Sequence, residues 1–196
     1  DEEIALFASS HSGEELHTDL LLKTSEKYNL NLKYLICGAQ RPFHDKTADR
    51  ILNRNNEFLK IHNNCSGKHL SMLLYSKLLN VDFQNYYKID HKSQTNINEF
   101  FYEIFQTKDI TYGIDGCGLP AIRLRVSDFI DSINYIKNSK YNELWNRVFN
   151  AYVRFPDIIG GTNRADSNLI NNSNSALLAK SGAEGVMFVT NNNESF

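Results

Sequence analysis

The sequence predicts one domain of mixed α and β structure. Several segments repeat apolar residues with helical spacing, and short runs rich in β-branched and aromatic residues stand between them. The ten glycines gather in six short clusters, which mark the turns between these segments. Because 196 residues can bury one good-sized core and no proline- or serine-rich linker divides them, we expect residues 1–196 to form a single domain.

Four segments carry a helical stripe. In the first, Leu16, Leu20 and Tyr28 share a face, with acidic residues before them and lysines after them, as the helix dipole favours. The other stripes are Ile97–Phe105, Val126–Ile136 and Leu144–Phe155, the last of which Pro156 helps to end.

Four short runs have the composition of strands: Ile4–Ala8, Tyr34–Cys37, Ile110–Ile114 and Val186–Thr190. The first and the last of them lie near the two ends of the chain, and the chain begins with Asp1 rather than Met. We therefore expect it to be a piece of a longer protein.

Charge and cysteine content narrow the class of protein. A formal net charge of −2, well mixed along the chain, argues against a nucleic-acid partner, and no apolar run is long enough to cross a membrane. Three widely spaced cysteines do not suit a disulfide-stapled secreted protein, so we expect a cytoplasmic one.

The glycine clusters also hold all three cysteines, together with His, Lys and Asp side chains. Reactive side chains interleaved with glycine at the ends of secondary structure are what an active site built from loops requires. The alternative is ordinary turn chemistry, with cysteine as a small buried apolar residue. Several such clusters together favour a site.

Ser10 and His11 are the first candidates. Ser12 and Glu15 have the spacing of a capping box at the start of the first helix, which explains Ser12 but not its two neighbours. Ser10 and His11 follow the expected first strand, where side chains often face a site.

Cys65, Lys68 and His69 form the densest group of reactive residues. Cys65 is expected near a helix N-terminus with Lys68 one turn away, and both features lower the pKa of a thiol. The alternative is a buried cysteine with Lys68 in solvent.

Asp115 and Cys117 lie in a turn with three glycines, and Cys117 with Cys65 and a basic side chain could form half of a zinc site, although this spacing alone is weak evidence. Arg164 could hold a substrate carboxylate or form a surface pair with Asp166. Lys180 is a weaker candidate of the same kind.

Together these clusters resemble one family, the L-asparaginase II family of the thermolabile or rhizobial type. The resemblance runs from about Ser9 to Val186. It rests on the motifs Ser10-His11-Ser12-Gly13-Glu14, Cys37-Gly38, Asn64-Cys65-Ser66-Gly67-Lys68-His69, Gly113-Ile114-Asp115-Gly116-Cys117-Gly118, Gly160-Gly161 with Arg164 and Asp166, and Lys180 with Gly182-Ala183-Glu184-Gly185-Val186.

The resemblance implies a serine β-lactamase-like fold, incomplete here at both ends, in a homodimeric enzyme that hydrolyses L-asparagine to L-aspartate and ammonia. It also implies a zinc ion held by Cys65, Lys68 and Cys117. Ser10, His69 and Asp115 would line the catalytic pocket. Zinc between two thiolates would favour a neutral, coordinating lysine amine.

The chain departs from the family pattern at three places. Gln40-Arg41 stands where the family usually has a histidine, and Lys92 stands where it usually has a proline. The family also places a Ser-x-x-Lys nucleophile before the Ser-His-Ser-Gly motif, and no lysine here has a serine three positions earlier. We therefore expect this chain alone to be inactive, with an upstream serine as the nucleophile of the whole protein.

The sequence thus predicts an amidohydrolase in which Ser10, Lys68, His69 and Asp115 are catalytic, while His11 and Arg164 bind the substrate. Two alternatives stay open. One is a thiol-dependent hydrolase with Cys65 as nucleophile and His69 as base. The other is a module that binds zinc or an amino acid without catalysis.

Overall fold

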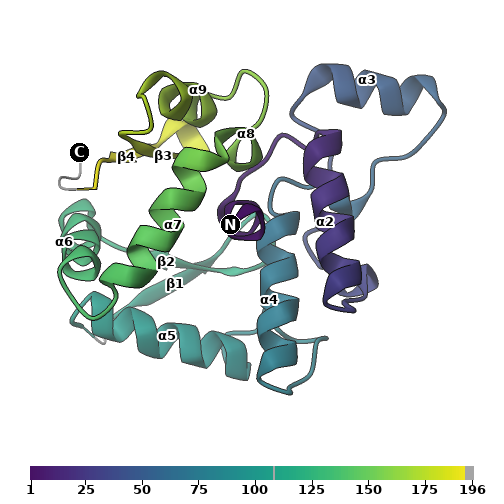
Figure 1. The fold of residues 1–196 in the computed structure, drawn as a ribbon. Helices are drawn as coiled ribbons and strands as arrows, with labels where there is room; N and C mark the ends of the chain where they lie inside the picture. The colour runs from purple at the N-terminus through teal and green to yellow at the C-terminus, as the bar shows by residue number, and fades with distance from the viewer. Residues whose placement is uncertain (108, 193–196) are drawn as a thin grey trace.

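The structure is a computed structural model that describes residues 1–107 and 109–192, and it confirms a mixed α and β architecture (Figure 1). Most of the described chain is helical. In chain order the elements are α1 (Glu2–Ala8), α2 (Glu15–Lys27), α3 (Asp45–Asn53), α4 (Ser66–Leu78), α5 (Lys92–Ile104), β1 (Thr111–Ile114), β2 (Pro120–Arg123), α6 (Val126–Lys137), α7 (Asn142–Arg154), α8 (Pro156–Ile159), α9 (Ala165–Asn172), β3 (Leu178–Ser181) and β4 (Met187–Thr190), with short 3₁₀ turns at Leu32–Tyr34, Lys60–His62 and Ala183–Gly185.

The strands form two separate antiparallel hairpins. β1 pairs with β2, and β3 pairs with β4 so that Lys180 lies opposite Phe188. These positions confirm the strands expected at Ile110–Ile114 and Val186–Thr190. The four segments with a helical stripe are confirmed as α2, α5, α6 and α7.

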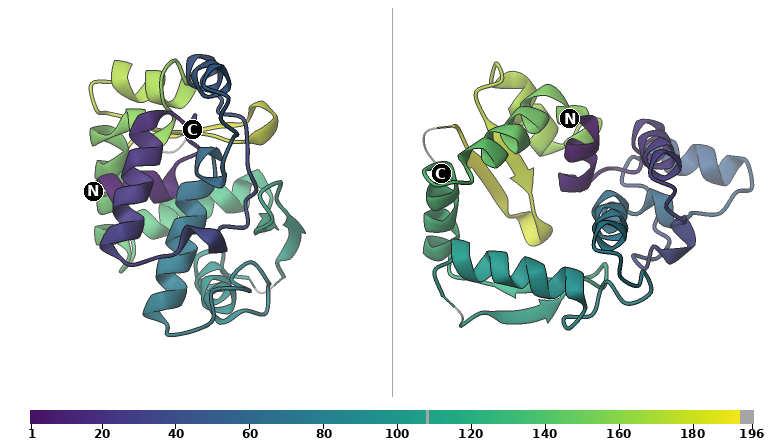
Figure 2. Two further views of the ribbon diagram at one scale, coloured as in Figure 1. Left: turned by 90° about the vertical axis from the view of Figure 1, so that its right-hand side faces the viewer. Right: turned by 60° about the horizontal axis from the view of Figure 1, so that its bottom comes forward.

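The strand expected at Ile4–Ala8 is wrong, because this segment is the helix α1. α1 lies between α4 on one side and α7 and α8 on the other (Figure 2). Gly67 of α4 permits this close approach, since a Cβ there would lie 2.2 Å from the carbonyl oxygen of Leu6. A short apolar run fits a buried strand and a buried helix equally well, and two glutamates in the first turn support the helix.

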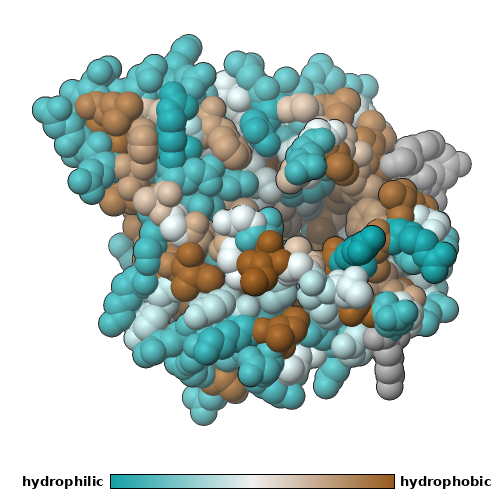
Figure 3. Space-filling model, turned by 180° about the vertical axis from the view of Figure 1, so that it is seen from behind, coloured by the Kyte–Doolittle hydropathy of each residue, from teal (hydrophilic) through white to brown (hydrophobic). Residues whose placement is uncertain are grey.

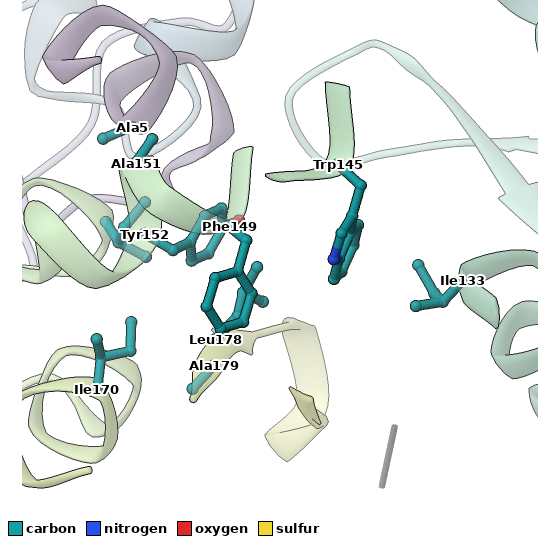
Figure 4. Close-up of a cluster of buried hydrophobic side chains, with 10 residues drawn as sticks. Ala5, Ile133, Trp145, Phe149, Ala151, Tyr152, Ile170, Leu178 and Ala179 are labelled. Carbon is teal, nitrogen blue, oxygen red and sulfur yellow. The ribbon is translucent and has the colours of Figure 1, made fainter. Parts of the chain in front are cut away.

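Two hydrophobic cores meet at α1. Ala5 belongs to the first core, which also contains Trp145, Phe149 and Tyr152 of α7, Ile133 of α6 and the β3 residues Leu178 and Ala179 (Figure 4). Leu6 belongs to the second core, with residues of α2 and α4 and with Tyr86 and Cys117. The chain that leaves α1 therefore begins at the junction of the two cores.

Two smaller expectations also need correction. Tyr34–Cys37 forms no strand: Tyr34 ends a 3₁₀ turn, and Leu35 after it has an extended backbone. The capping box of Ser12 and Glu15 is wrong as well: α2 begins two residues later than that pattern requires, with Glu14 at the N-cap, and the Ser12 hydroxyl instead donates to the Glu14 carboxylate. Hydroxyl groups of serine bond to whichever acceptor the local turn presents.

On the back of the molecule, apolar and polar side chains alternate around a central hollow (Figure 3). The most exposed large apolar side chains are Ile114 of β1 and Val126 of α6. Among the described residues, no helix combines the length and the hydrophobicity that a membrane crossing requires.

Candidate functional site

Four of the glycine-rich clusters converge on one pocket, together with the loop that holds Gln40 and Phe43. The pocket has a volume of about 740 Å³. Its walls are Ser10, Gln40, Phe43, Asn63, Asn64, Cys65, Asp115, Gly116, Cys117, Arg164, Lys180, Ser181, Gly182 and Ala183. The fold thus brings together six of the residues that the sequence singled out: Ser10, Cys65, Asp115, Cys117, Arg164 and Lys180.

A serine and a lysine from opposite ends of the chain meet in this pocket. Ser10 follows α1, where its N–H donates to the carbonyl oxygen of Ile159 at 3.2 Å. Lys180 extends from β3, and its Nζ lies 2.7 Å from Ser10 Oγ and 2.5 Å from the carbonyl oxygen of Ser181. Burial of the amine lowers the pKa of Lys180 below its ordinary value of 10.5.

A buried carboxylate fixes the strand that carries the lysine. Asp166 is fully buried and accepts hydrogen bonds from the N–H of Ser181 at 3.2 Å and from its hydroxyl at 2.5 Å. The Asp166 charge also counteracts the effect of burial on the pKa of Lys180. Asp166 therefore holds the end of β3 in register with the pocket.

Arg164 lies on the same wall. Its Nη2 donates to Ser181 Oγ at 3.3 Å, and its guanidinium stands 5.3 Å from the centre of the half-exposed Phe43 ring. No ion pair of Arg164 with a carboxylate is found among the described residues, so the surface pair with Asp166 is wrong. The charge of Arg164 is available to a ligand in the pocket.

Cys65 and Cys117 form a coupled pair of thiols. The Cys65 thiol donates toward Cys117, and this contact, aided by the His69 ring and a backbone N–H, lowers the pKa of Cys117 to about 4 although burial opposes it. The same contact and burial raise the pKa of Cys65. The net pKa of Cys65 is therefore raised, against the expectation: the charge of Lys68 does lower it, but the contact with Cys117 and burial outweigh that effect.

Asp115 adds a second negative charge beside this thiolate. Its Oδ2 lies 3.7 Å from Cys117 Sγ, while its Oδ1 accepts the N–H of Gly116 at 2.7 Å. Asp115 itself is exposed in the pocket. Thiolate and carboxylate together make this wall of the pocket attractive to a cation.

His69 does not line the pocket. It is fully buried, and its Nδ1 lies 2.6 Å from the hydroxyl of Tyr86. That hydroxyl also accepts the N–H of Ile36 at 3.1 Å, so Tyr86 ties the Nδ1 side of the His69 ring to the backbone at Ile36.

His11 and Lys68 also lie outside the pocket walls. His11 is fully buried: its Nε2 lies 2.9 Å from Ser66 Oγ, its Nδ1 accepts the N–H of Gly13, and its ring stacks on His17 at 4.7 Å. With both ring nitrogens occupied, His11 has no group to offer a substrate in this structure. Lys68 is exposed on the first turn of α4, close enough for its charge to favour the thiolate form of Cys65.

The donor atoms at this wall suit a zinc ion in part. Two thiols in contact are preferred zinc ligands, and His69 Nε2 is a buried nitrogen without a hydrogen-bond partner among the described residues. Within the same residues, no group of three or more His, Cys, Asp or Glu side chains is placed to hold a metal. A zinc ion here would need a further ligand of another kind, such as the Lys68 amine.

Reasoning from the sequence placed Lys180 only among the weaker candidates, and it did not identify Ser181 or the role of Asp166. The signal for Lys180 was its position directly after two apolar residues, Leu178 and Ala179, which are buried in the first core. A lysine at the end of such a buried run cannot reach solvent freely, so it needs a partner inside the protein.

The family model described as L-asparaginase II matches residues 1–196, which is the whole chain. No functionally curated protein matches the chain.

Proposed function

The chain belongs to the L-asparaginase II family, and we propose that it forms the pocket in which L-asparagine is hydrolysed to L-aspartate and ammonia. The contact between Ser10 Oγ and Lys180 Nζ carries this proposal. A hydroxyl beside a buried amine of lowered pKa is the pairing that acyl transfer needs, because the amine can take up the hydroxyl proton.

Lys180 in its neutral form accepts a proton through Ser10 Oγ as a hydroxyl attacks the side-chain amide. The attacking hydroxyl is that of Ser10 or that of a serine in the Ser-x-x-Lys segment implied by the family resemblance. The oxygen forms a bond to the amide carbon, the carbon–nitrogen bond breaks, and the proton held by Lys180 leaves with ammonia. Water then cleaves the ester, releases L-aspartate and restores the hydroxyl.

The charged walls of the pocket explain a preference for an amino acid as substrate. Arg164 is the cation available to the α-carboxylate, and Asp115 is the anion available to the α-ammonium group. A simple amide lacks both charges and would lose both contacts. Neither His11 nor His69 is needed for this recognition.

We extend the proposal to a zinc ion held by Cys65, Lys68 and Cys117. The cation would neutralise the negative charge of Cys117 and Asp115. When bound, zinc supplies a fixed positive charge and Lewis acidity at this wall of the pocket. We further propose that the whole protein is a homodimer with a serine β-lactamase-like fold. We also propose a cytoplasmic location, which agrees with three cysteines that are all free thiols.

Ammonia release from L-asparagine by the full gene product tests the function. We expect Ser10→Ala and Lys180→Met each to lower kcat/KM by about 100-fold or more. Lys46→Met, which removes an exposed lysine far from the pocket walls, is the matched control and should retain wild-type activity.

Calorimetric titration with L-aspartate separates catalysis from binding. The Lys180→Met variant should still bind L-aspartate, since Arg164 and Asp115 are intact. Wild-type protein that binds L-aspartate but releases no ammonia would establish the non-catalytic binding module instead. Loss of all activity on iodoacetamide treatment of metal-free protein would favour the thiol-dependent hydrolase.

A further inference from the structure

The side chain of Glu14 joins two segments of the pocket although it does not line it. Glu14 is the N-cap residue of α2, and its side chain is only 10% exposed. Its Oε1 accepts the hydroxyl of Ser12 at 2.5 Å and the backbone N–H of Thr162 at 2.7 Å, and its Oε2 accepts the hydroxyl of Thr162 at 2.7 Å. One carboxylate thus binds both the turn after Ser10 and the turn before Arg164.

These donors keep the buried carboxylate ionised. Burial raises the pKa of Glu14, but the hydrogen bonds from Ser12 and Thr162 outweigh it, and the net pKa is below its ordinary value of 4.5. No lysine or arginine pairs with Glu14 among the described residues; the nearest basic atom is His44 Nδ1 at 3.6 Å. Hydrogen bonds to an ionised acceptor are stronger than neutral ones, so the two turns are held firmly.

The turn that Glu14 holds is shaped for this contact. Gly161 has a φ of 116°, and a Cβ at this position would lie 2.0 Å from Ser12 Oγ and 2.4 Å from Glu14 Oε1. Only glycine lets the backbone approach the carboxylate so closely. Three residues later, Arg164 N–H donates to the carbonyl oxygen of Gly161 at 3.3 Å and closes the turn.

We propose that Glu14 is a positioning residue that fixes the Gly161–Arg164 turn and thereby sets the place of the Arg164 guanidinium in the pocket. This inference rests on the proposed function, because Arg164 is the residue assigned to the substrate carboxylate. Glu14 thus affects the affinity for the substrate through Arg164, which it does not touch.

Loss of the Glu14 side chain should affect substrate binding more than the catalytic step. Ser10 N–H donates to Ile159 and Ser12 N–H donates to Gly160 at 2.8 Å, so the backbone holds the Ser10 segment without the Glu14 side chain. Beyond Gly160, the Gly161 N–H donates to Ser167 Oγ at 3.0 Å and the Arg164 carbonyl accepts the N–H of Asn168 at 2.9 Å, while Thr162 between them bonds to Glu14 through both its N–H and its hydroxyl. Loss of Glu14 should therefore raise KM far more than it lowers kcat.

Three variants test this assignment by steady-state kinetics with L-asparagine. We expect Glu14→Ala to raise KM about tenfold while kcat stays within about threefold, and Glu14→Gln to raise KM less, since its amide oxygen can still accept one of the bonds. Thr162→Val removes one donor from an exposed side chain and should shift KM in the same direction without risk to the fold. Glu15→Gln is the matched control, because Glu15 is the exposed neighbour that pairs with Arg50.

A double-mutant cycle distinguishes positioning from general support of the fold. In an Arg164→Ala background, Glu14→Gln should no longer change kcat/KM, because the group that it positions is gone. Equal effects of Glu14→Gln in the presence and absence of Arg164 would overturn the assignment, as would a wild-type KM in Glu14→Ala.

Amide hydrogen exchange decides the inference independently of activity. The amide of Thr162 should exchange faster in Glu14→Ala than in Glu15→Gln, and unchanged exchange would refute the tie itself. If the wild-type protein releases no ammonia, the proposed function fails, and affinity for L-aspartate then replaces KM in the same set of variants. The two failures are thereby distinguished.

Discussion

Lys180 Nζ donates to Ser10 Oγ at 2.7 Å, although 170 positions separate these residues in the chain. The contact depends on the two cores that meet at α1. One end of the pair follows α1 directly, and the other lies on β3, whose residues Leu178 and Ala179 are buried in the first core. Placement of the amine away from water is also what lowers its pKa.

The lowered pKa of Lys180 predicts the pH dependence of the reaction. A lysine that accepts a proton must be neutral, so kcat/KM should rise with pH as the pH approaches and passes the pKa of Lys180, which lies below 10.5. In Lys180→Met this rise should disappear. A full pH–rate profile of wild type and variant checks this, and an identical alkaline limb in both would exclude Lys180 as the base.

The helical stripes could be read from the sequence because helical periodicity is a local property. Two of the four expected strands were wrong for the opposite reason: Ile4–Ala8 and Tyr34–Cys37 are short, and only tertiary packing decides their conformation. The Ser12 capping box failed because Glu14, another strong acceptor, lies two residues away.

The residues of the pocket could be found from their clustering with glycine, but their partners could not. Nothing local in the sequence brings Lys180 to Ser10 or Thr162 to Glu14, since both contacts bridge distant segments. The same applies to His69, whose hydrogen-bond partner, the Tyr86 hydroxyl, lies 17 positions further along the chain.

The stacked pair of His11 and His17 predicts loss of stability in mild acid. Burial lowers the pKa of both residues, and each uses Nδ1 as an acceptor for a backbone N–H. The unfolded chain therefore binds more protons than the folded one below the unfolded histidine pKa of about 6.5, so stability falls as the pH falls below that value.

Each of the two histidines contributes a slope of up to about 1.4 kcal/mol per pH unit to the free energy of unfolding. Urea unfolding between pH 7.5 and 5 measures it. His17→Gln should reduce the slope even if it lowers the stability at neutral pH, because one titrating group is removed. A slope unaltered by this substitution would contradict the assignment.

The Tyr86 hydroxyl predicts a large cost for the loss of one oxygen atom. Tyr86 is fully buried, and its hydroxyl accepts the N–H of Ile36 and forms a hydrogen bond with Nδ1 of His69. Tyr86→Phe leaves two buried polar groups unpaired and should lower the free energy of unfolding by about 2–3 kcal/mol. Tyr75→Phe is the control: its hydroxyl accepts one partly buried bond from Asn96, so the cost should be below about 1 kcal/mol.

The proposed zinc ion predicts selective protection of two thiols. Alkylation followed by mass spectrometry should find that Cys65 and Cys117 react with iodoacetamide in chelator-treated protein and react more slowly after zinc is added. Cys37 is an internal reference, since it is buried and its pKa is raised to about 11. Equal protection of Cys37, or none at Cys65, would count against a zinc site at this wall.

Substitution by alanine should have opposite effects on the free energy of unfolding at Gly161 and at Gly113. At Gly161, the positive φ and the overlap with Ser12 Oγ and Glu14 Oε1 leave no room for a Cβ, so Gly161→Ala should lower the free energy of unfolding by at least about 2 kcal/mol.

At Gly113 in β1, an added Cβ would meet no atom within 4 Å, and the backbone needs no positive φ. Gly113→Ala should therefore leave the stability unchanged or raise it by about 0.5 kcal/mol, because alanine reduces the freedom of the unfolded chain. Urea unfolding of both variants measures the difference. The Gly161 turn also carries Arg164, so the folded Gly161→Ala variant should bind L-aspartate more weakly than the wild type. Gly113→Ala should bind L-aspartate like the wild type.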